Sequence, residues 1–280
     1  MIPKHSVAVD ANQLRTNLEM GMDEIVKDIV VLTQRAGYDY MEESFGPEFS
    51  TFSGFSLNLG PNDYRVGFNS DHFGRGAAFH RFTVSHELGH LSISAHRQLL
   101  DGEILHRSQS ERFRSTNPIE READYFAVCF LAPAQAFRKA SHPFDYNREA
   151  VFTLSELFGI SPYSAVLRFI ELTDLACTLV VSNADSTIDY EWPSGKMKDE
   201  FGYRSLRDEP VPLSTLTADF INGNTGEDTC TIKLNDWFGD LDVDVEATES
   251  VIELGYNGKF LTLLTPHAGD LESYRAEADY

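Results

Sequence analysis

The stretch His86-Glu87-Leu88-Gly89-His90 decides how this chain is read. Two histidines four residues apart on a helix project from one face about a turn apart, so both imidazoles can bind one Zn²⁺. The glutamate between them can then reach a metal-bound water. Gly89 costs about 1 kcal/mol relative to alanine inside a helix, which indicates close approach by another segment or by the metal. The alternative is a surface helix with two unrelated histidines.

A catalytic zinc site takes three protein ligands and leaves a fourth position to water. His96 has the spacing of the last histidine in the pattern HExxHxxGxxH, but Ile93 stands where that pattern needs a glycine to turn the chain. If the helix simply continued, His96 would rotate well away from the face of His86. We therefore expect His96 at a helix end or in solvent.

Glu120 is the better candidate for the third ligand. It follows Asn117, which is a typical N-cap, and it falls inside the apolar stripe of the helix that we expect from there to Pro133. A carboxylate that faces a core must be neutralised or coordinated, whereas Glu122 is expected to point away. Asp124, one turn further on, could accept a hydrogen bond from a zinc-bound histidine. The alternative is that Glu120 only closes a capping box with Asn117.

These motifs together resemble the ImmA/IrrE-type metallopeptidases. The residues that carry the resemblance are Arg81-Phe82-Thr83-Val84-Ser85 before HELGH, Glu120-x-x-Ala123-Asp124-x-Phe126-Ala127 after it, and Leu131-x-Pro133. The resemblance covers roughly residues 25–172. It implies a gluzincin-like site with His86, His90 and Glu120 on one zinc ion, Glu87 as general base and Asp124 behind the ligands. It also implies a substrate class, helix-turn-helix transcriptional repressors, which are cut to relieve repression in stress responses or mobile elements.

The residues that would bind a substrate are less clearly marked. Val66, Gly67, Phe68 and Asn69 also look like the family's strand before the active helix. Because Gly67 allows close backbone approach, the segment 64–69 could be an edge strand that pairs with an extended substrate, or an ordinary sheet strand. Donors for the tetrahedral oxyanion are needed as well. The nearby candidates, each expected to be structural rather than catalytic, are Tyr125, His80, Arg81 and His106.

The pattern along the chain predicts an α+β fold. We expect a zincin-like metallopeptidase domain over residues 1–150, a helix-turn-helix-like segment over 151–175 and an acidic β-rich domain over 176–280 that regulates the protein or recognises its substrate. The expected helices and strands lie at residues 23–32 (helix), 55–59 and 64–69 (strands), 154–158 and 165–170 (helices), and 177–181, 229–234, 251–256 and 259–264 (strands). Trp192 and Trp237 are expected to anchor the second core.

Charge and composition limit the classes of partner that this chain can bind. The net charge is -21, and residues 176–280 carry 7 Lys or Arg against 21 Asp or Glu, so no phosphate-binding surface is expected. The acidic surface attracts a basic partner or is merely solvated. Arg168 stands almost alone on the second helix of the helix-turn-helix segment, so we expect no direct nucleic-acid binding. Three cysteines, no signal-peptide layout and no apolar run of about 18 residues predict a cytoplasmic protein that does not enter a membrane.

We therefore expect a zinc-dependent endopeptidase, with one Zn²⁺ per chain, that cleaves a helix-turn-helix repressor. The alternative is a non-catalytic protein that binds a repressor or toxin without cutting it. Glu87 favours the enzyme, because a structural metal site has little reason to keep a general base between its ligands. A broad housekeeping peptidase is a third possibility.

Overall fold

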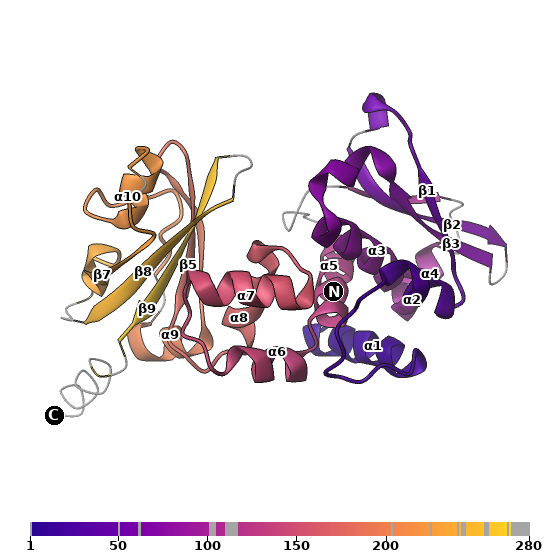
Figure 1. Ribbon diagram of the computed structural model, residues 1–280, viewed down its shortest axis with the longest axis horizontal. Helices are drawn as coiled ribbons and strands as arrows, with labels where there is room; N and C mark the ends of the chain where they lie inside the picture. The colour runs from indigo at the N-terminus through magenta and orange to yellow at the C-terminus, as the bar shows by residue number, and fades with distance from the viewer. Residues whose placement is uncertain are drawn as a thin grey trace. The chain divides into compact units, whose positions relative to one another are not determined.

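The computed structural model describes residues 2–49, 51–60, 63–100, 105–109, 117–202, 204–224, 226–239, 241, 245–254, 258–267 and 269. The chain forms two compact units (Figure 1). The first comprises Met1–Lys139 with Ser155–Ser164, and the second comprises Ala140–Leu154 with Ala165–Tyr280. The mixed α+β class expected from the sequence is confirmed, and the second unit is rich in strands.

The first unit contains a four-stranded sheet. Its strands are β1 (Asp39–Glu43), β2 (Phe52–Gly60), β3 (Asp63–Asn69) and β4 (Leu105–Gln109), in the order β1-β3-β2-β4. The two strands expected near residues 55–59 and 64–69 pair antiparallel as β2 and β3, while β1 runs parallel to β3.

Residues 64–69 form an ordinary sheet strand and not the edge strand that was the other possibility. Strand β3 lies between β1 and β2, so its backbone groups are paired on both sides and cannot accept an extended substrate. The glycine at position 67 is needed for packing and not for the approach of a substrate. A Cβ atom there would lie 2.0 Å from the ring of its cross-strand neighbour Phe55. The glycine thus makes room for a core aromatic side chain.

Helix α3 (Ala77–Ser92) packs on this sheet and against α5 (Pro118–Leu131), as Figure 1 shows. Gly89 lies at the contact between the two helices, where an added Cβ would meet the Phe126 ring at 3.1 Å. The glycine therefore allows close packing of α3 on α5. Ile93 adopts an extended conformation and ends α3, so the chain turns before α4 (Ser94–Leu100). Two 3-10 helices complete this region, η1 (Pro47–Phe49) and η2 (Ser70–Arg75).

The N-terminal helices differ from expectation. The helix predicted over 23–32 is α2 (Ile29–Arg35), and it begins late because Asp28 accepts hydrogen bonds from the backbone N–H groups of Val30 and Val31. A preceding helix, α1 (Lys4–Asn17), was not expected. It packs on α5 through buried residues that include Arg15, whose guanidinium donates to the Phe130 carbonyl at 2.7 Å.

Beyond α6 (Ala134–Ser141), the helix-turn-helix shape expected from the sequence is present. Helices α7 (Arg148–Phe158) and α8 (Pro162–Leu172) meet at 106°, and Gly159 adopts a positive φ of 61° in the turn. Arg168 is only 3% exposed and pairs with Glu171 at 2.7 Å, so its charge is not presented to a phosphate. Within the described residues no single helix is long and apolar enough to cross a membrane; this bent pair reaches the threshold only when both helices are taken together.

The second unit contains an antiparallel sheet in the order β6-β5-β9-β8-β7. Its strands are β5 (Thr178–Asn183), β6 (Ile188–Pro193), β7 (Thr229–Lys233), β8 (Glu246–Glu253) and β9 (Lys259–Pro266), with α9 (Gly195–Phe201), α10 (Leu216–Ile221) and η3 (Leu234–Asp236). Four of these strands were expected, and β6 was not. Trp237 is buried in this core, as predicted. Trp192 is 44% exposed, so the prediction that it anchors the core is wrong.

Candidate metal centre

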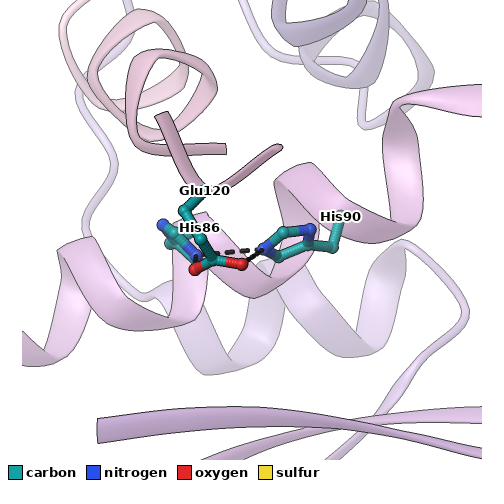
Figure 2. A group of neighbouring side chains, drawn as sticks. All are labelled: His86, His90 and Glu120. Atoms are coloured by element: carbon teal, nitrogen blue, oxygen red, sulfur yellow. Dashed lines mark hydrogen bonds and ion pairs between the residues drawn. The ribbon is translucent and has the colours of Figure 1, made fainter. Parts of the chain in front are cut away.

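Three of the residues singled out by the sequence converge on one point (Figure 2). His86 and His90 come from α3 and Glu120 from the first turn of α5. The two Nε2 atoms are 3.0 Å apart, and the Glu120 carboxylate oxygens lie 3.3 Å from His86 Nε2 and 3.6 Å from His90 Nε2. All the donor atoms lie within 4.8 Å of one another.

The donor set fits a metal cation. Tetrahedral zinc with bonds of about 2.0–2.1 Å keeps its ligand atoms roughly 3.4 Å apart, which is close to the separations here. Both histidines are nearly fully buried, and Glu120 retains 13% exposure of its side chain. A donor set of two buried imidazole nitrogens and one carboxylate binds zinc in preference to magnesium or calcium. These residues are therefore compatible with a transition-metal site of three protein ligands.

The electrostatics of the three residues are strongly coupled. Burial alone would lower the pKa of His86, but hydrogen bonding to Asp124 and Glu120 outweighs burial and raises it to about 10. Burial lowers the pKa of His90 well below its usual value, and the neighbouring His86 and His106 lower it further. Burial would raise the pKa of Glu120, yet His106 and His86 hold it well below its usual range. Glu120 is thus ready as an anionic donor at neutral pH.

Asp124 lies directly behind the first histidine. Nδ1–H of His86 donates to Asp124 Oδ1 at 2.8 Å. Because this bond occupies Nδ1, Nε2 is the nitrogen left to bind a metal once its proton is displaced, and Nε2 is the atom that faces Glu120 and His90. Asp124 is four residues after Glu120, so one face of α5 supplies both side chains.

Glu87 is fully buried beside the three ligand candidates. Its Oε2 accepts a hydrogen bond of 2.7 Å from the hydroxyl of Ser56 on β2. Gly54, two residues earlier on the same strand, lets the backbone come close, because a Cβ there would lie 2.7 Å from Glu87 Oε1 and 2.6 Å from Thr83 Cγ2. Sequence reasoning missed Gly54 and Ser56. The only signal was their position on a strand that precedes the HELGH helix.

His106 reaches the same place from the edge strand β4. Its Nε2 lies 3.3 Å from Glu120 Oε1, which is an ion-pair distance without hydrogen-bond geometry. The ring centroids of His106 and His90 are 4.4 Å apart. Burial lowers the pKa of His106, but Glu120 and Glu87 raise it above its usual value. Among the four residues considered as oxyanion donors, His106 is the one in contact with the candidate ligands.

The other three oxyanion candidates make contacts elsewhere. His80 Nε2 lies 2.6 Å from the hydroxyl of Tyr40. Arg81 donates to the Gly159 carbonyl at 3.0 Å. The ring of Tyr125 is covered by the Lys4 ammonium group at 4.9 Å.

Two expectations near the site need correction. Glu122 was expected to point away from the core, and His96 to lie at a helix end or in solvent. His96 does lie at a helix end, in the first turn of α4, but neither residue is exposed to solvent. Both are buried, and His96 Nε2 lies 2.9 Å from Glu122 Oε2. The turn at Ile93 carries His96 back toward α5, so the histidine finds a carboxylate partner there. Val66, Gly67, Phe68 and Asn69, expected to bind substrate, are buried within β3. The loop that could have covered the site, residues 107–116, lies mostly outside the described residues.

Comparison with known proteins agrees with this geometry. Residues 77–169 match the family model of the IrrE N-terminal-like domain, a peptidase family, and the matched range contains all three candidate ligands. A solved structure, a transcriptional regulator from Mycobacterium tuberculosis, aligns over 95% of this chain and 78% of that chain with a TM-score of 0.53 and 15% identity. That likeness shows the fold alone. None of the curated proteins compared with the chain matches it. The match over residues 77–169 supports the resemblance of this part of the chain to the ImmA/IrrE-type metallopeptidases.

Proposed function

We propose that this protein is a zinc-dependent endopeptidase that cleaves a helix-turn-helix transcriptional repressor. The observation that carries the proposal is the convergence of His86, His90 and Glu120 with a buried glutamate, Glu87, between the two histidines in the sequence. A site with three protein ligands keeps one coordination position for water, as catalytic zinc sites do. A purely structural site would be closed by a fourth ligand.

In this proposal each side chain has a separate task. His86, His90 and Glu120 hold one zinc ion, and bound zinc would supply an acidified water and polarise the scissile carbonyl. Glu87, oriented by Ser56, accepts the proton of the attacking water and returns it to the leaving amine. Asp124 holds His86 in the tautomer that presents Nε2. His106, whose Nε2 lies 3.3 Å from Glu120 Oε1, is the donor that we propose for the developing oxyanion.

The strand that would receive an extended substrate is β4 rather than β3. Strand β4 is at the edge of the described sheet, next to β2, and it carries His106 into the site. An extended peptide can add to such an edge through main-chain hydrogen bonds. The backbone of β4 thus gives a direction for substrate binding, and the acidic surface of the chain favours a basic partner such as a DNA-binding repressor.

We also propose that residues 176–280, which were expected to form a separate domain, sense a signal or recognise the substrate. Deletion of this segment should abolish the response to signal or the selection of the partner while the metal ligands of α3 and α5 stay in place. Unchanged, signal-dependent cleavage by the truncated chain would contradict this role.

The decisive experiment compares wild type with Glu87→Gln on a purified helix-turn-helix repressor encoded beside the gene. Glutamine keeps the shape of the side chain and cannot act as a base, so cleavage should disappear while zinc content stays the same. Glu156→Gln, at an exposed position on α7, is the matched control and should cleave normally. A chelator should stop wild-type cleavage, and zinc should restore it.

The same comparison separates the alternatives. Repressor inactivation that persists in Glu87→Gln, with no cleaved product, would favour a protein that binds without cutting. Cleavage of unrelated unfolded proteins at the same rate would favour a broad housekeeping peptidase.

A further inference from the structure

The imidazole of His90 is enclosed by three other histidine rings. Its centroid lies 4.8 Å from that of His86, 4.4 Å from that of His106 and 5.2 Å from that of His96. His86 and His106 have tasks in the proposed reaction, whereas His96 has none. His96 is thus a buried side chain that packs on a candidate metal ligand and takes no part in the chemistry described above.

The turn after α3 places His96 against His90. Ile93 ends α3 in an extended conformation, and the His96 N–H donates to the Ile93 carbonyl at 3.0 Å in the first turn of α4. The His96 side chain is 2% exposed, and its ring is tilted by 40° from the ring of His90. Because close-packed rings restrict each other's rotation, the position of His96 limits the orientations that His90 can adopt.

Glu122 of α5 fixes the His96 ring in turn. Its Oε2 accepts a hydrogen bond from His96 Nε2–H at 2.9 Å, and its Oε1 accepts one from the Ile2 N–H at 2.5 Å. The other nitrogen of His96, Nδ1, is buried and has no hydrogen-bond partner in the part of the chain that the structure describes. The Glu122 carboxyl is therefore the polar contact that holds this ring, and a buried bond of this kind is stronger than one in water.

We infer that His96 and Glu122 form a positioning pair for the metal ligand His90. The pair acts through the His90 ring and touches neither the substrate nor the metal. The inference rests on the proposed function for the role of the metal centre, but it concerns metal affinity and ligand geometry rather than cleavage. Groups that orient a ligand from behind are typically worth 10- to 100-fold in metal affinity, because a ligand that is free to turn binds less tightly.

The test measures zinc affinity and the visible absorption of the cobalt-substituted protein, which reports the geometry of the ligands around the ion. Glu122→Leu keeps a side chain of similar size and removes the hydrogen bond to His96. Zinc affinity should therefore fall by about tenfold or more, and the cobalt bands should shift. Glu122→Gln retains an oxygen that can accept the His96 N–H, so it should restore most of the wild-type affinity and spectrum.

A double-mutant cycle shows whether the two residues act as one unit. His96→Leu should lower zinc affinity about as much as Glu122→Leu does, and the double variant should lose no more than the larger single effect. The double variant also leaves no unpaired carboxyl in the core, so it should remain folded.

Val128→Ala is the matched control. It shortens a buried side chain on the same helix α5, outside the metal centre. The unfolding temperature should drop because a buried contact is lost, while zinc affinity and the cobalt spectrum should stay at wild-type values.

Three results would overturn the inference: wild-type affinity and spectrum in Glu122→Leu, an equal loss in Glu122→Leu and Glu122→Gln, or the same change of spectrum in Val128→Ala. If wild type bound neither zinc nor cobalt, the positioning pair and the proposed peptidase would fall together. Normal metal binding without cleavage of a repressor would remove the peptidase alone, because affinity and spectrum would still report the action of His96 and Glu122 on His90.

Discussion

Asp124 Oδ1 accepts a hydrogen bond from Nδ1–H of His86 at 2.8 Å, and this bond ties helix α5 to helix α3 at the candidate metal centre. Glu120, one turn earlier on α5, meets Nε2 of the same imidazole at 3.3 Å. Two carboxylates of one helix face therefore hold both nitrogens of one histidine. Helix α5 thus fixes the position of a ligand that it does not carry.

Loss of the Asp124 carboxylate should weaken the metal site without removing a ligand. Asp124→Ala frees the His86 ring to rotate and to adopt the other tautomer, so we expect zinc affinity to fall by about 10- to 100-fold. Competition with a chromophoric zinc chelator measures this change. Asp23→Ala, at an exposed position outside the site, is the control and should bind zinc like wild type. Equal affinity in both variants would mean that Asp124 does not orient the ligand.

The hydrogen bond from Ser56 to Glu87 should matter for the reaction and not for the metal. A hydrogen bond to a charged group contributes about 1.5–3 kcal/mol, so Ser56→Ala should reduce kcat/KM by roughly tenfold or more. Zinc content should stay at the wild-type level, because Ser56 contacts the glutamate rather than a ligand. Ser53→Ala removes a second buried hydroxyl of β2 and is the matched control. A similar loss of activity in both variants would assign the effect to packing.

The candidate ligands were predictable because each is encoded by local spacing. His86 and His90 share a helix face, and Glu120 lies near a helix start that Asn117 marks by capping the Ile119 N–H. Residues brought in by the sheet were not predictable in the same way. Ser56 and His106 lie 31 and 14 residues from their partners in the site, Glu87 and Glu120 respectively. They have no motif of their own, and only tertiary pairing places them there.

The errors in the predicted strands and helices have the same origin. The order of strands in a sheet depends on pairing between distant segments, so the sequence left open whether β3 is an edge strand or, as the structure shows, a central one. Strand β6 was missed although residues 188–192 alternate apolar and polar side chains, which is the pattern of a half-buried strand. Helix α1 was missed because it has little amphipathic pattern and is held by packing on α5 and by the buried Arg15.

The close approach at Gly54 should not tolerate a side chain. Gly54→Ala would place a methyl group against Glu87 and Thr83, and overpacking of this kind costs about 1–3 kcal/mol of unfolding free energy. Urea unfolding measures the cost, and peptidase assays should show a parallel loss because the displaced side chain is Glu87. Gly195→Ala, in the first turn of α9 with open space at its Cβ position, should be neutral. Equal stability of the two variants would contradict the packing argument.

Because Cys177 is buried, we expect the protein to lose stability at alkaline pH. Burial raises the pKa of its thiol to about 12, above the value of 9.0 expected in the unfolded chain. The unfolded state therefore releases the proton first, so the contribution of the neutral thiol is fully present below pH 9 and is lost as the pH rises toward 12. At pH 10 the loss should be about 1 kcal/mol. Cys177→Ala should show a smaller drop between pH 8 and pH 10 than wild type in urea unfolding. An identical drop in both proteins would exclude this thiol as its source.

Removal of the metal should lower the thermal stability of the protein, because the folded state then loses the zinc ion that Glu120 helps to bind. A ligand that binds only the folded state at 100 times its Kd stabilises it by about 2.7 kcal/mol, so a chelator should reduce Tm by several degrees. Glu120→Gln exchanges an anionic oxygen donor for a neutral amide, and its Tm should respond little to chelator or to added zinc. Glu156→Gln, at an exposed position, should keep the wild-type response. Zinc should restore Tm after chelation and magnesium should not, because buried imidazole donors favour zinc over hard cations. A full response in Glu120→Gln, or full recovery with magnesium, would contradict a zinc site built from these three side chains.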